Sequence, residues 1–320
     1  MKENDHGEPL RVLLVTRFPE LHPELERLAL PGIHLERTKD DTTTGHAIAQ
    51  AEIILADPPL IATHLDRASE LKWLQSTWAG VDAIFRINSR RDYLLTRVQG
   101  LFGPLMAEYI LGHIIARERG VVTLAEQQQE RIWKPEIRYR RLSTLTLGVL
   151  GLGEIGSAVA RTAKAFGMTV WGLRTRDEPV PGVDRIFTPD RLDEFLAGPD
   201  YLANTLPSTP LTQGLLSGGI LQDCQSTAVF MNVGRGDVVD ETSLVTAMRE
   251  GWISGAVLDV FPEEPLPPES PLWDLPNVTV TPHVAAYSFP DTVAEIFATN
   301  LVRYQSGEPL LYQVDWERGY

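Results

Sequence analysis

Two charged side chains in the second half of the sequence are of types that can grip a carbonyl group and move a proton. Arg235 directly follows the apolar run TAVFMNVG, and His283 follows the β-like run VTVT. Both therefore stand at the carboxyl end of an expected strand, where open α/β sheets bind ligands. A guanidinium holds a carboxylate or carbonyl oxygen through paired hydrogen bonds, and an imidazole exchanges a proton near neutral pH. Taken singly, a histidine is more often a packed or solvated side chain than a catalyst, and an arginine in a glycine-rich turn can be a plain surface residue.

A carboxylate partner for His283 is available in the loop PEEPLP, as either Glu263 or Glu264. A carboxylate beside an imidazole stabilises the charged ring and raises its pKa, which keeps a proton available near neutral pH. A pair of this kind, together with Arg235, would suit proton transfer to a polarised carbonyl oxygen.

A glycine-rich turn, G-x-G-x-x-G, lies between an apolar strand and a helix in TLGVLGLGEIGSAVARTAKAF. The first glycine permits a tight turn, the second lets the backbone approach a pyrophosphate, and the third lets the helix pack closely on the strand. The helix N-terminus then presents N–H groups to the phosphates. The predicted dinucleotide site at this turn comprises Gly151, Leu152, Gly153, Glu154, Ile155 and Gly156.

Two arginines follow the next strand, MTVWGL, where an acid would bond the ribose 2′-hydroxyl of NAD. Arg174, Thr175 and Arg176 instead offer two charged forks and a hydroxyl to a 2′-phosphate. We therefore predict NADP(H) as the preferred cofactor, with NAD(H) possible. The alternative is that both arginines are solvated loop residues and that the protein does not read the phosphate.

Short aliphatic runs alternate with amphipathic stretches along the chain, which indicates an α/β fold with parallel sheets covered on both faces. Strands are expected at residues 11–16, 52–56, 72–77 and 93–98, a long helix near 103–119 followed by a more polar one, and a final helix over 291–307. We predict two Rossmann-like lobes: residues 1–100 plus 287–320, and a nucleotide-binding lobe over residues 101–286.

The composition narrows the classes of partner. Lys and Arg total 29 against 43 Asp and Glu, and the net charge of −14 disfavours nucleic acid and anionic membranes. Cys224 is the lone cysteine, so a reducing compartment is expected, and the first residues read as neither a signal peptide nor a membrane span. The sequence predicts a cytoplasmic protein without a metal site.

Together, the motifs STWAGVD, GLGEIG, NVGRGD, VLDVFPEEPLPPESPLW and TPHVAA resemble the D-2-hydroxyacid dehydrogenases, and especially their glyoxylate/hydroxypyruvate reductase branch. The resemblance implies that Arg235 orients the substrate and that His283 is the acid–base residue. It also favours Glu264 over Glu263 as the partner of His283, because the family's glutamate directly precedes a proline. The first lobe is then a discontinuous, flavodoxin-like substrate-binding domain, with the active-site cleft between the lobes.

Further site residues are implied by the same resemblance. The N–H groups of Ala79, Gly80 and Val81 would hold the substrate carboxylate, beside a Trp78 that either narrows the pocket or only packs. Asp259 would contact the nicotinamide amide. The remaining expected cofactor contacts are Leu206, Pro207, Thr212, Val233 and Ala285. A homodimer is the family's habit, and the helix over 103–119 is the expected face.

The predicted function is reduction of small 2-oxo acids such as glyoxylate and hydroxypyruvate to D-2-hydroxy acids with NADPH. The alternatives are another D-2-hydroxyacid, formate or phosphite-type dehydrogenase on the same scaffold. A nicotinamide-sensing regulatory protein, like the related corepressors, is the alternative from another class.

Overall fold

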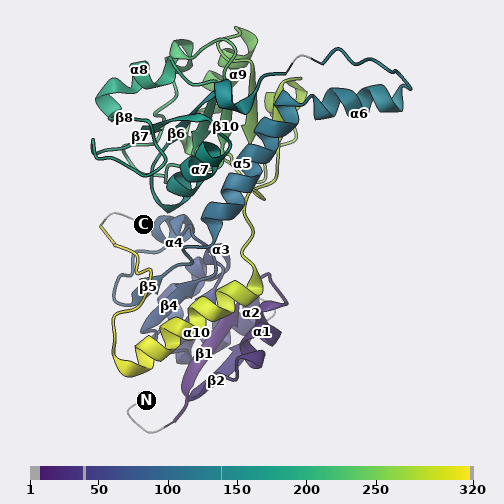
Figure 1. Cartoon of the computed structure of the whole chain (residues 1–320). Coiled ribbons are helices and arrows are strands. Elements are labelled where there is room, and N and C mark those ends of the chain that lie inside the picture. The colour runs from purple at the N-terminus through teal and green to yellow at the C-terminus, as the bar shows by residue number, and fades with distance from the viewer. Residues whose placement is uncertain (1–7, 39–40, 138, 318–320) are drawn as a thin grey trace. The chain divides into compact units, whose positions relative to one another are not determined.

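The computed structural model of the protein describes residues 8–38, 41–137 and 139–317. These residues form two compact units (Figure 1). Unit 1 contains the described residues up to Leu101 and those from Ser288 onward, and unit 2 is the continuous segment Phe102–Tyr287. The chain passes from one unit to the other after Leu101 and again after Tyr287, in each case one residue beyond the predicted boundary.

Unit 1 is built on a sheet of 5 parallel strands in the order β2-β1-β3-β4-β5, which is the strand order of flavodoxin-like folds. Its strands are β1 (Leu10–Val15), β2 (Ile33–Arg37), β3 (Ile53–Ala56), β4 (Trp73–Ser76) and β5 (Leu94–Thr96). Its helices are α1 (Leu21–Arg27), α2 (Asp41–Ala47), α3 (Pro58–Ile61), α4 (Asp82–Ile87) and α10 (Pro290–Ser306).

The last helix, α10, returns to complete unit 1 (Figure 1). The ring of Trp73 in β4 stacks on Phe297 of α10 at a centroid distance of 5.2 Å. The buried amide of Asn300 donates to Gln75 in the same strand at 3.0 Å. The C-terminal helix is therefore part of the core of the N-terminal sheet.

Unit 2 contains a sheet of 7 parallel strands in the order β12-β11-β10-β9-β6-β7-β8. Its strands are β6 (Thr146–Leu150), β7 (Thr169–Leu173), β8 (Arg185–Phe187), β9 (Tyr201–Asn204), β10 (Val229–Asn232), β11 (Gly255–Leu258) and β12 (Val278–Val280). Its helices are α5 (Phe102–Glu118), α6 (Val121–Gln129), α7 (Glu154–Ala165), α8 (Leu192–Leu196) and α9 (Glu241–Arg249). The strand order reverses direction between β6 and β9, which is the switch point where dinucleotides bind in Rossmann folds.

Residues of β6 divide between two apolar cores, one on each face of the unit 2 sheet. Leu147 and Val149 join the core that contains side chains of α5 and α7, and Leu150 joins the core that contains side chains of α8 and α9. This burial on both faces explains why the central strands read as continuous apolar runs. The predicted fold class, α/β with two Rossmann-like lobes of parallel strands, is confirmed.

Candidate active site

Three neighbouring strands of unit 2 lead into buried polar residues at their carboxyl ends. Asn204 ends β9, Asn232 ends β10, and Asp259 directly follows β11, and none of the three is more than 1% exposed. Buried polar groups need hydrogen-bond partners. Each of these side chains finds them in the loop that follows a strand, so all three fix site loops to the sheet.

The asparagine pair positions the loop that carries Arg235. Asn204 donates to the side-chain oxygen of Asn232 at 2.8 Å, and the amide of Asn232 donates to the carbonyl of Arg235 at 3.0 Å. Gly234 between them passes close to the neighbouring loop, because a Cβ there would lie 2.7 Å from the Leu206 carbonyl oxygen. The backbone under Arg235 is thus fixed, and its half-buried guanidinium donates to the carbonyl of Gly234 at 2.7 Å.

His283 and Glu264 form the predicted pair. Nδ1 of His283 lies 2.8 Å from Oε2 of Glu264, and Oε1 of the same carboxylate accepts the N–H of Phe261 at 2.9 Å. The hydrogen bond to Glu264 raises the pKa of His283 above its ordinary value, against a partial desolvation that lowers it. The pKa of Glu264 is lowered, because its bonds to His283 and Phe261 outweigh the desolvation that would raise it. With Nδ1 committed to the carboxylate, Nε2 is the nitrogen that can exchange a proton.

Arg235 acts electrostatically on both members of the pair. Its positive charge lowers the pKa of Glu264 further and opposes the rise in the pKa of His283. All three predicted catalytic side chains therefore belong to one cluster at the carboxyl edge of the unit 2 sheet.

Asp259 holds the loop that contains His283. Its main-chain oxygen accepts the N–H of His283 at 2.9 Å, and its carboxylate accepts the N–H groups of Val284 and Ala285 at 2.8 and 2.9 Å. Oδ1 also accepts the hydroxyl of Thr281 at 2.6 Å. The predicted contact of Asp259 with a nicotinamide amide stays a prediction; three of about four acceptor positions on the carboxylate serve this loop.

The glycine-rich turn lies directly after β6. Gly151 has a φ of +90°, which favours glycine, and a Cβ on Gly156 would lie 1.9 Å from the carbonyl oxygen of Gly151. Gly153 differs, since it has extended backbone angles and a Cβ there would meet no atom of the described residues within 4 Å. Neither its conformation nor packing against the described residues explains this glycine, whereas close approach of a pyrophosphate does. The turn therefore fits a dinucleotide, with Leu152, Glu154 and Ile155 between its glycines at the start of α7.

The predicted phosphate-reading residues follow β7. Arg174 is partly buried, with a side chain that is 26% exposed, whereas the side chain of Arg176 is 73% exposed and Thr175 is exposed. Both guanidinium groups face the carboxylate of Glu178, at 3.5 Å from Arg174 and 4.0 Å from Arg176. The arginines thus lie side by side around one anionic group, with Arg174 the better fixed.

The other expected cofactor residues of unit 2 lie around the same edge. Leu206 packs against Gly151, and Pro207 begins a loop closed by Thr212, whose hydroxyl donates to the Pro207 carbonyl at 2.6 Å. The side chains of Val233 and Ala285 are buried in the core shared with α5 and α7. Any contact of these two residues with a ligand would be made by the main chain.

The predicted carboxylate cradle belongs to unit 1, where it follows β4. Ser76 accepts the N–H of Trp78 at 2.9 Å and donates to its carbonyl at 2.8 Å, which makes a tight turn. Within the described part of the chain, the N–H groups of Ala79, Gly80 and Val81 meet no hydrogen-bond acceptor. Successive N–H groups of this kind form a concavity suited to an anion.

A buried carboxylate beneath this turn was not foreseen from the sequence. Asp57 is fully buried and accepts the hydroxyls of Thr16 and Thr77 and the N–H of Arg17. These donors follow two different strands, so Asp57 ties the loops after β1 and β4 together. The only sequence signal is a polar residue at the end of the apolar run EIILA.

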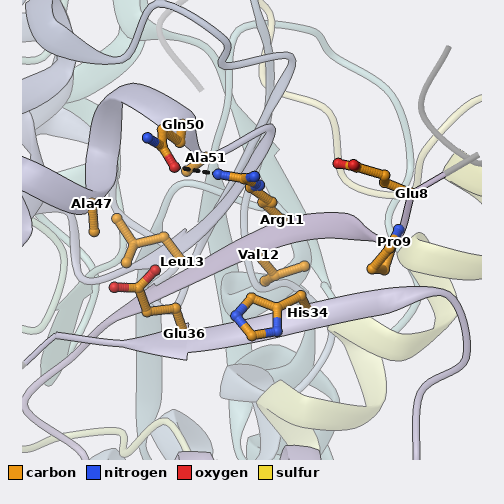
Figure 2. A pocket seen from close by; sticks show the side chains of 10 residues that line it. All are labelled: Glu8, Pro9, Arg11, Val12, Leu13, His34, Glu36, Ala47, Gln50 and Ala51. Atoms are coloured by element: carbon orange, nitrogen blue, oxygen red, sulfur yellow. Dashed lines mark hydrogen bonds between the residues drawn. The ribbon is translucent and has the colours of Figure 1, made fainter. Parts of the chain in front are cut away.

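A cavity of about 330 Å³ lies elsewhere in unit 1, against β1 and β2. Figure 2 shows Arg11 of β1 donating to Gln50 at its wall, with His34 and Glu36 on the neighbouring strand. None of the predicted site residues lines it. Among residues 8–38, 41–137 and 139–317, no helix combines the length and apolarity needed to span a membrane.

Comparison with known proteins identifies the scaffold. The family model for the NAD-binding domain of D-isomer specific 2-hydroxyacid dehydrogenases matches residues 111–285. The structure of a D-isomer specific 2-hydroxyacid dehydrogenase family protein from Aeromonas salmonicida is 39% identical, covers 96% of this chain and 99% of its own, and has a TM-score of 0.92.

Two further solved structures carry NADP. A probable 2-hydroxyacid dehydrogenase from Rhizobium etli, in complex with NADP, HEPES and L(+)-tartaric acid, is 31% identical over 98% of this chain and 100% of its own, with a TM-score of 0.83. The NADPH-dependent glyoxylate/hydroxypyruvate reductase of Sinorhizobium meliloti, in complex with NADP and sulfate, is 29% identical over 97% of this chain and 100% of its own, with a TM-score of 0.86. The resemblance inferred from the sequence motifs is confirmed: the chain belongs to the D-isomer specific 2-hydroxyacid dehydrogenases, NAD(P)-dependent oxidoreductases that act on CH–OH groups.

Proposed function

We propose that this protein is an NADPH-preferring reductase of small 2-oxo acids, with glyoxylate and hydroxypyruvate as its substrates and D-2-hydroxy acids as its products. The observation that carries the proposal is the pairing of Arg174 and Arg176 around a single anionic group at the end of β7. A 2′-phosphate presents more negative charge and more acceptor oxygens than the carboxylate now between them. The NADP bound to the Rhizobium etli and Sinorhizobium meliloti structures supports the same preference.

The residues of unit 2 account for the proton and the charge of this reaction. When bound, a reduced nicotinamide supplies the hydride that reduces the carbonyl carbon. His283, protonated through its bond to Glu264, gives the Nε2 proton to the carbonyl oxygen, so that a hydroxyl forms and neutral imidazole remains. Arg235 stabilises the negative charge that develops on that oxygen. In the opposite direction, neutral His283 removes the hydroxyl proton.

The substrate class follows from the anion-binding groups. A 2-oxo acid carries a carboxylate next to its reactive carbonyl. Arg235 suits this carboxylate, and the N–H groups of Ala79, Gly80 and Val81 form a second concavity of the required chemistry. Trp78 is partly exposed beside them, where its bulk favours small substrates such as glyoxylate over branched ones.

The test is a steady-state assay of NADPH and NADH oxidation with glyoxylate, hydroxypyruvate and pyruvate. Formate and phosphite are assayed with NADP⁺ and NAD⁺ in parallel. We expect turnover with glyoxylate and hydroxypyruvate and a higher kcat/KM with NADPH. Turnover with formate or phosphite alone would assign another reaction to the scaffold, and tight NADPH binding without any turnover would favour a regulatory protein.

We also propose a cytoplasmic homodimer, with a dimer interface other than the helix over 103–119 that was expected from the sequence. Ala107, Ile110, Leu111 and Ile114 of α5 are buried within unit 2 itself. The apolar surface lies instead on the projecting arm, residues 121–133, in which no residue of α6 is buried and Trp133 is 95% exposed (Figure 1). A second copy of the chain is the occupant that we propose for this arm. Trp133→Glu should lower the mass measured by sedimentation, whereas Val302→Glu, at an exposed position of α10, should leave it unchanged.

A further inference from the structure

The loop that presents His283 is held in an uncommon conformation. His283 has a φ of +55°, in the left-handed region that non-glycine residues rarely adopt. The N–H of His283 and those of the next two residues all donate to Asp259. The orientation of the imidazole therefore depends on where the side chain of Asp259 is fixed.

A hydroxyl chain fixes Asp259 from the side of helix α5. The hydroxyl of Thr281 lies 2.6 Å from Oδ1 of Asp259, and the phenolic oxygen of Tyr109 lies 2.6 Å from the hydroxyl of Thr281. Tyr109 is separated from Thr281 by 172 positions in the sequence. The chain therefore links the middle of α5 to the loop of His283.

The direction of these hydrogen bonds follows from counting protons. A carboxylate only accepts, so the single hydroxyl proton of Thr281 is donated to Asp259. The proton between Thr281 and Tyr109 must then come from the phenol. Burial is the largest effect on the pKa of Tyr109, and the pKa is raised, which keeps the phenol protonated.

We propose that Tyr109 is a positioning residue, which orients His283 through Thr281 and Asp259. The inference rests on the proposed role of His283 as the proton donor and goes beyond the Arg235, Glu264 and His283 cluster. Tyr109 is packed beside His113, with ring centroids 4.5 Å apart, and this packing leaves its hydroxyl directed at Thr281. Tyr109 touches no reacting atom in this scheme and acts only through the loop.

The experiment compares two tyrosines that each lose one hydroxyl. Tyr109→Phe removes the bond to Thr281, and Tyr201→Phe removes a bond of 2.7 Å to the buried carboxylate of Glu118 in the same unit. We expect Tyr109→Phe to lower kcat with glyoxylate by about 3- to 10-fold, with KM for NADPH changed by less than about 2-fold. Tyr201→Phe should leave kcat within about 2-fold. Equal kcat values for the two variants would overturn the proposal.

Variants of Thr281 test the hydroxyl chain from Tyr109 through Thr281 to Asp259. Thr281→Ser keeps the hydroxyl and should retain kcat, whereas Thr281→Val should lower it as Tyr109→Phe does. The double variant Tyr109→Phe with Thr281→Val should be no slower than Thr281→Val alone, because both changes break the same chain. Multiplicative losses in the double variant would show that the two hydroxyls act separately.

Hydrogen exchange separates this proposal from the proposed function. The amides of Val284 and Ala285 donate to Asp259, so their exchange should quicken in Tyr109→Phe and stay unchanged in Tyr201→Phe. This readout needs no substrate. Absence of turnover in the unmodified protein would defeat the proposed function alone, whereas unchanged exchange of the loop would defeat the role of Tyr109.

Discussion

Replacing Arg174 and Arg176 by alanine tests how the protein distinguishes NADPH from NADH. A hydrogen bond to a charged group contributes about 1.5–3 kcal/mol, and the partly buried Arg174 should approach the lower end of this range. Arg176 is mostly exposed, so solvent screening limits its contribution to about 0.2–1 kcal/mol. The two contributions sum to about 1.7–2.5 kcal/mol, so the double variant should lose about 20- to 70-fold in NADPH preference.

The single variants divide this effect unequally. We expect Arg174→Ala to raise the KM for NADPH by about 10-fold, and Arg176→Ala by about 2- to 5-fold. Glu178→Gln should lower the KM for NADPH by about 2-fold, because it removes the carboxylate that a 2′-phosphate must displace. None of these changes should move the KM for NADH by more than about 2-fold.

The assay measures the KM of NADPH and of NADH at saturating glyoxylate for each variant. Arg27→Ala is the matched control, because Arg27 is an exposed arginine that pairs with Glu24 and belongs to unit 1, outside the nucleotide-binding unit. Equal increases in the KM for NADPH and NADH would refute the reasoning, since arginines that read a 2′-phosphate cannot affect a cofactor that lacks it.

Three further predictions concern the proton, the turn and the buried carboxylate. Glu264 raises the pKa of His283, and reduction needs the protonated ring. Glu264→Gln should therefore lower the pH above which kcat/KM for reduction declines, and an unchanged pH–rate profile would contradict the pairing. Gly153→Val should lower the affinity for both NADPH and NADH by about 10-fold or more, while it changes the free energy of unfolding by less than about 1 kcal/mol. Gly156→Ala should instead lower the free energy of unfolding, measured in urea, by about 2 kcal/mol or more. Asp57→Asn should lower the free energy of unfolding by about 1–3 kcal/mol, because an amide cannot accept from all three donors; an unchanged urea midpoint would oppose this.

Local patterns in the sequence sufficed for the central strands and the glycine turn. The strands on both sides of that turn are apolar throughout, which is a strong signal. Strands β2 and β8 were not predicted, since each lies at the edge of its sheet, where IHLER is half-exposed and RIF spans only 3 residues. Periodicity is weak in segments of this length and exposure.

Contacts between residues far apart in the sequence limited how much of the site could be predicted. Arg235 and His283 were singled out because each follows an expected strand, and their catalytic roles were implied by the family resemblance. Nothing near Tyr109 in the sequence indicates a partner at Thr281, because Tyr109 occupies an apolar helix and reads as core packing. Asn232 was likewise hidden as the last residue of a strand, and its bond to Asn204 arises only when β9 and β10 pair. Such partners are fixed by tertiary pairing and not by local sequence.

The return of α10 to the first sheet has a consequence for the order in which the chain folds during synthesis. Unit 2 is one continuous segment, so all of its strands and helices emerge from the ribosome before α10 does. Trp73 and Gln75 of the first sheet, by contrast, can contact Phe297 and Asn300 only after α10 has emerged. We therefore expect the nucleotide-binding unit to fold first on the ribosome, with an incomplete and chaperone-accessible N-terminal sheet attached until the last helix emerges.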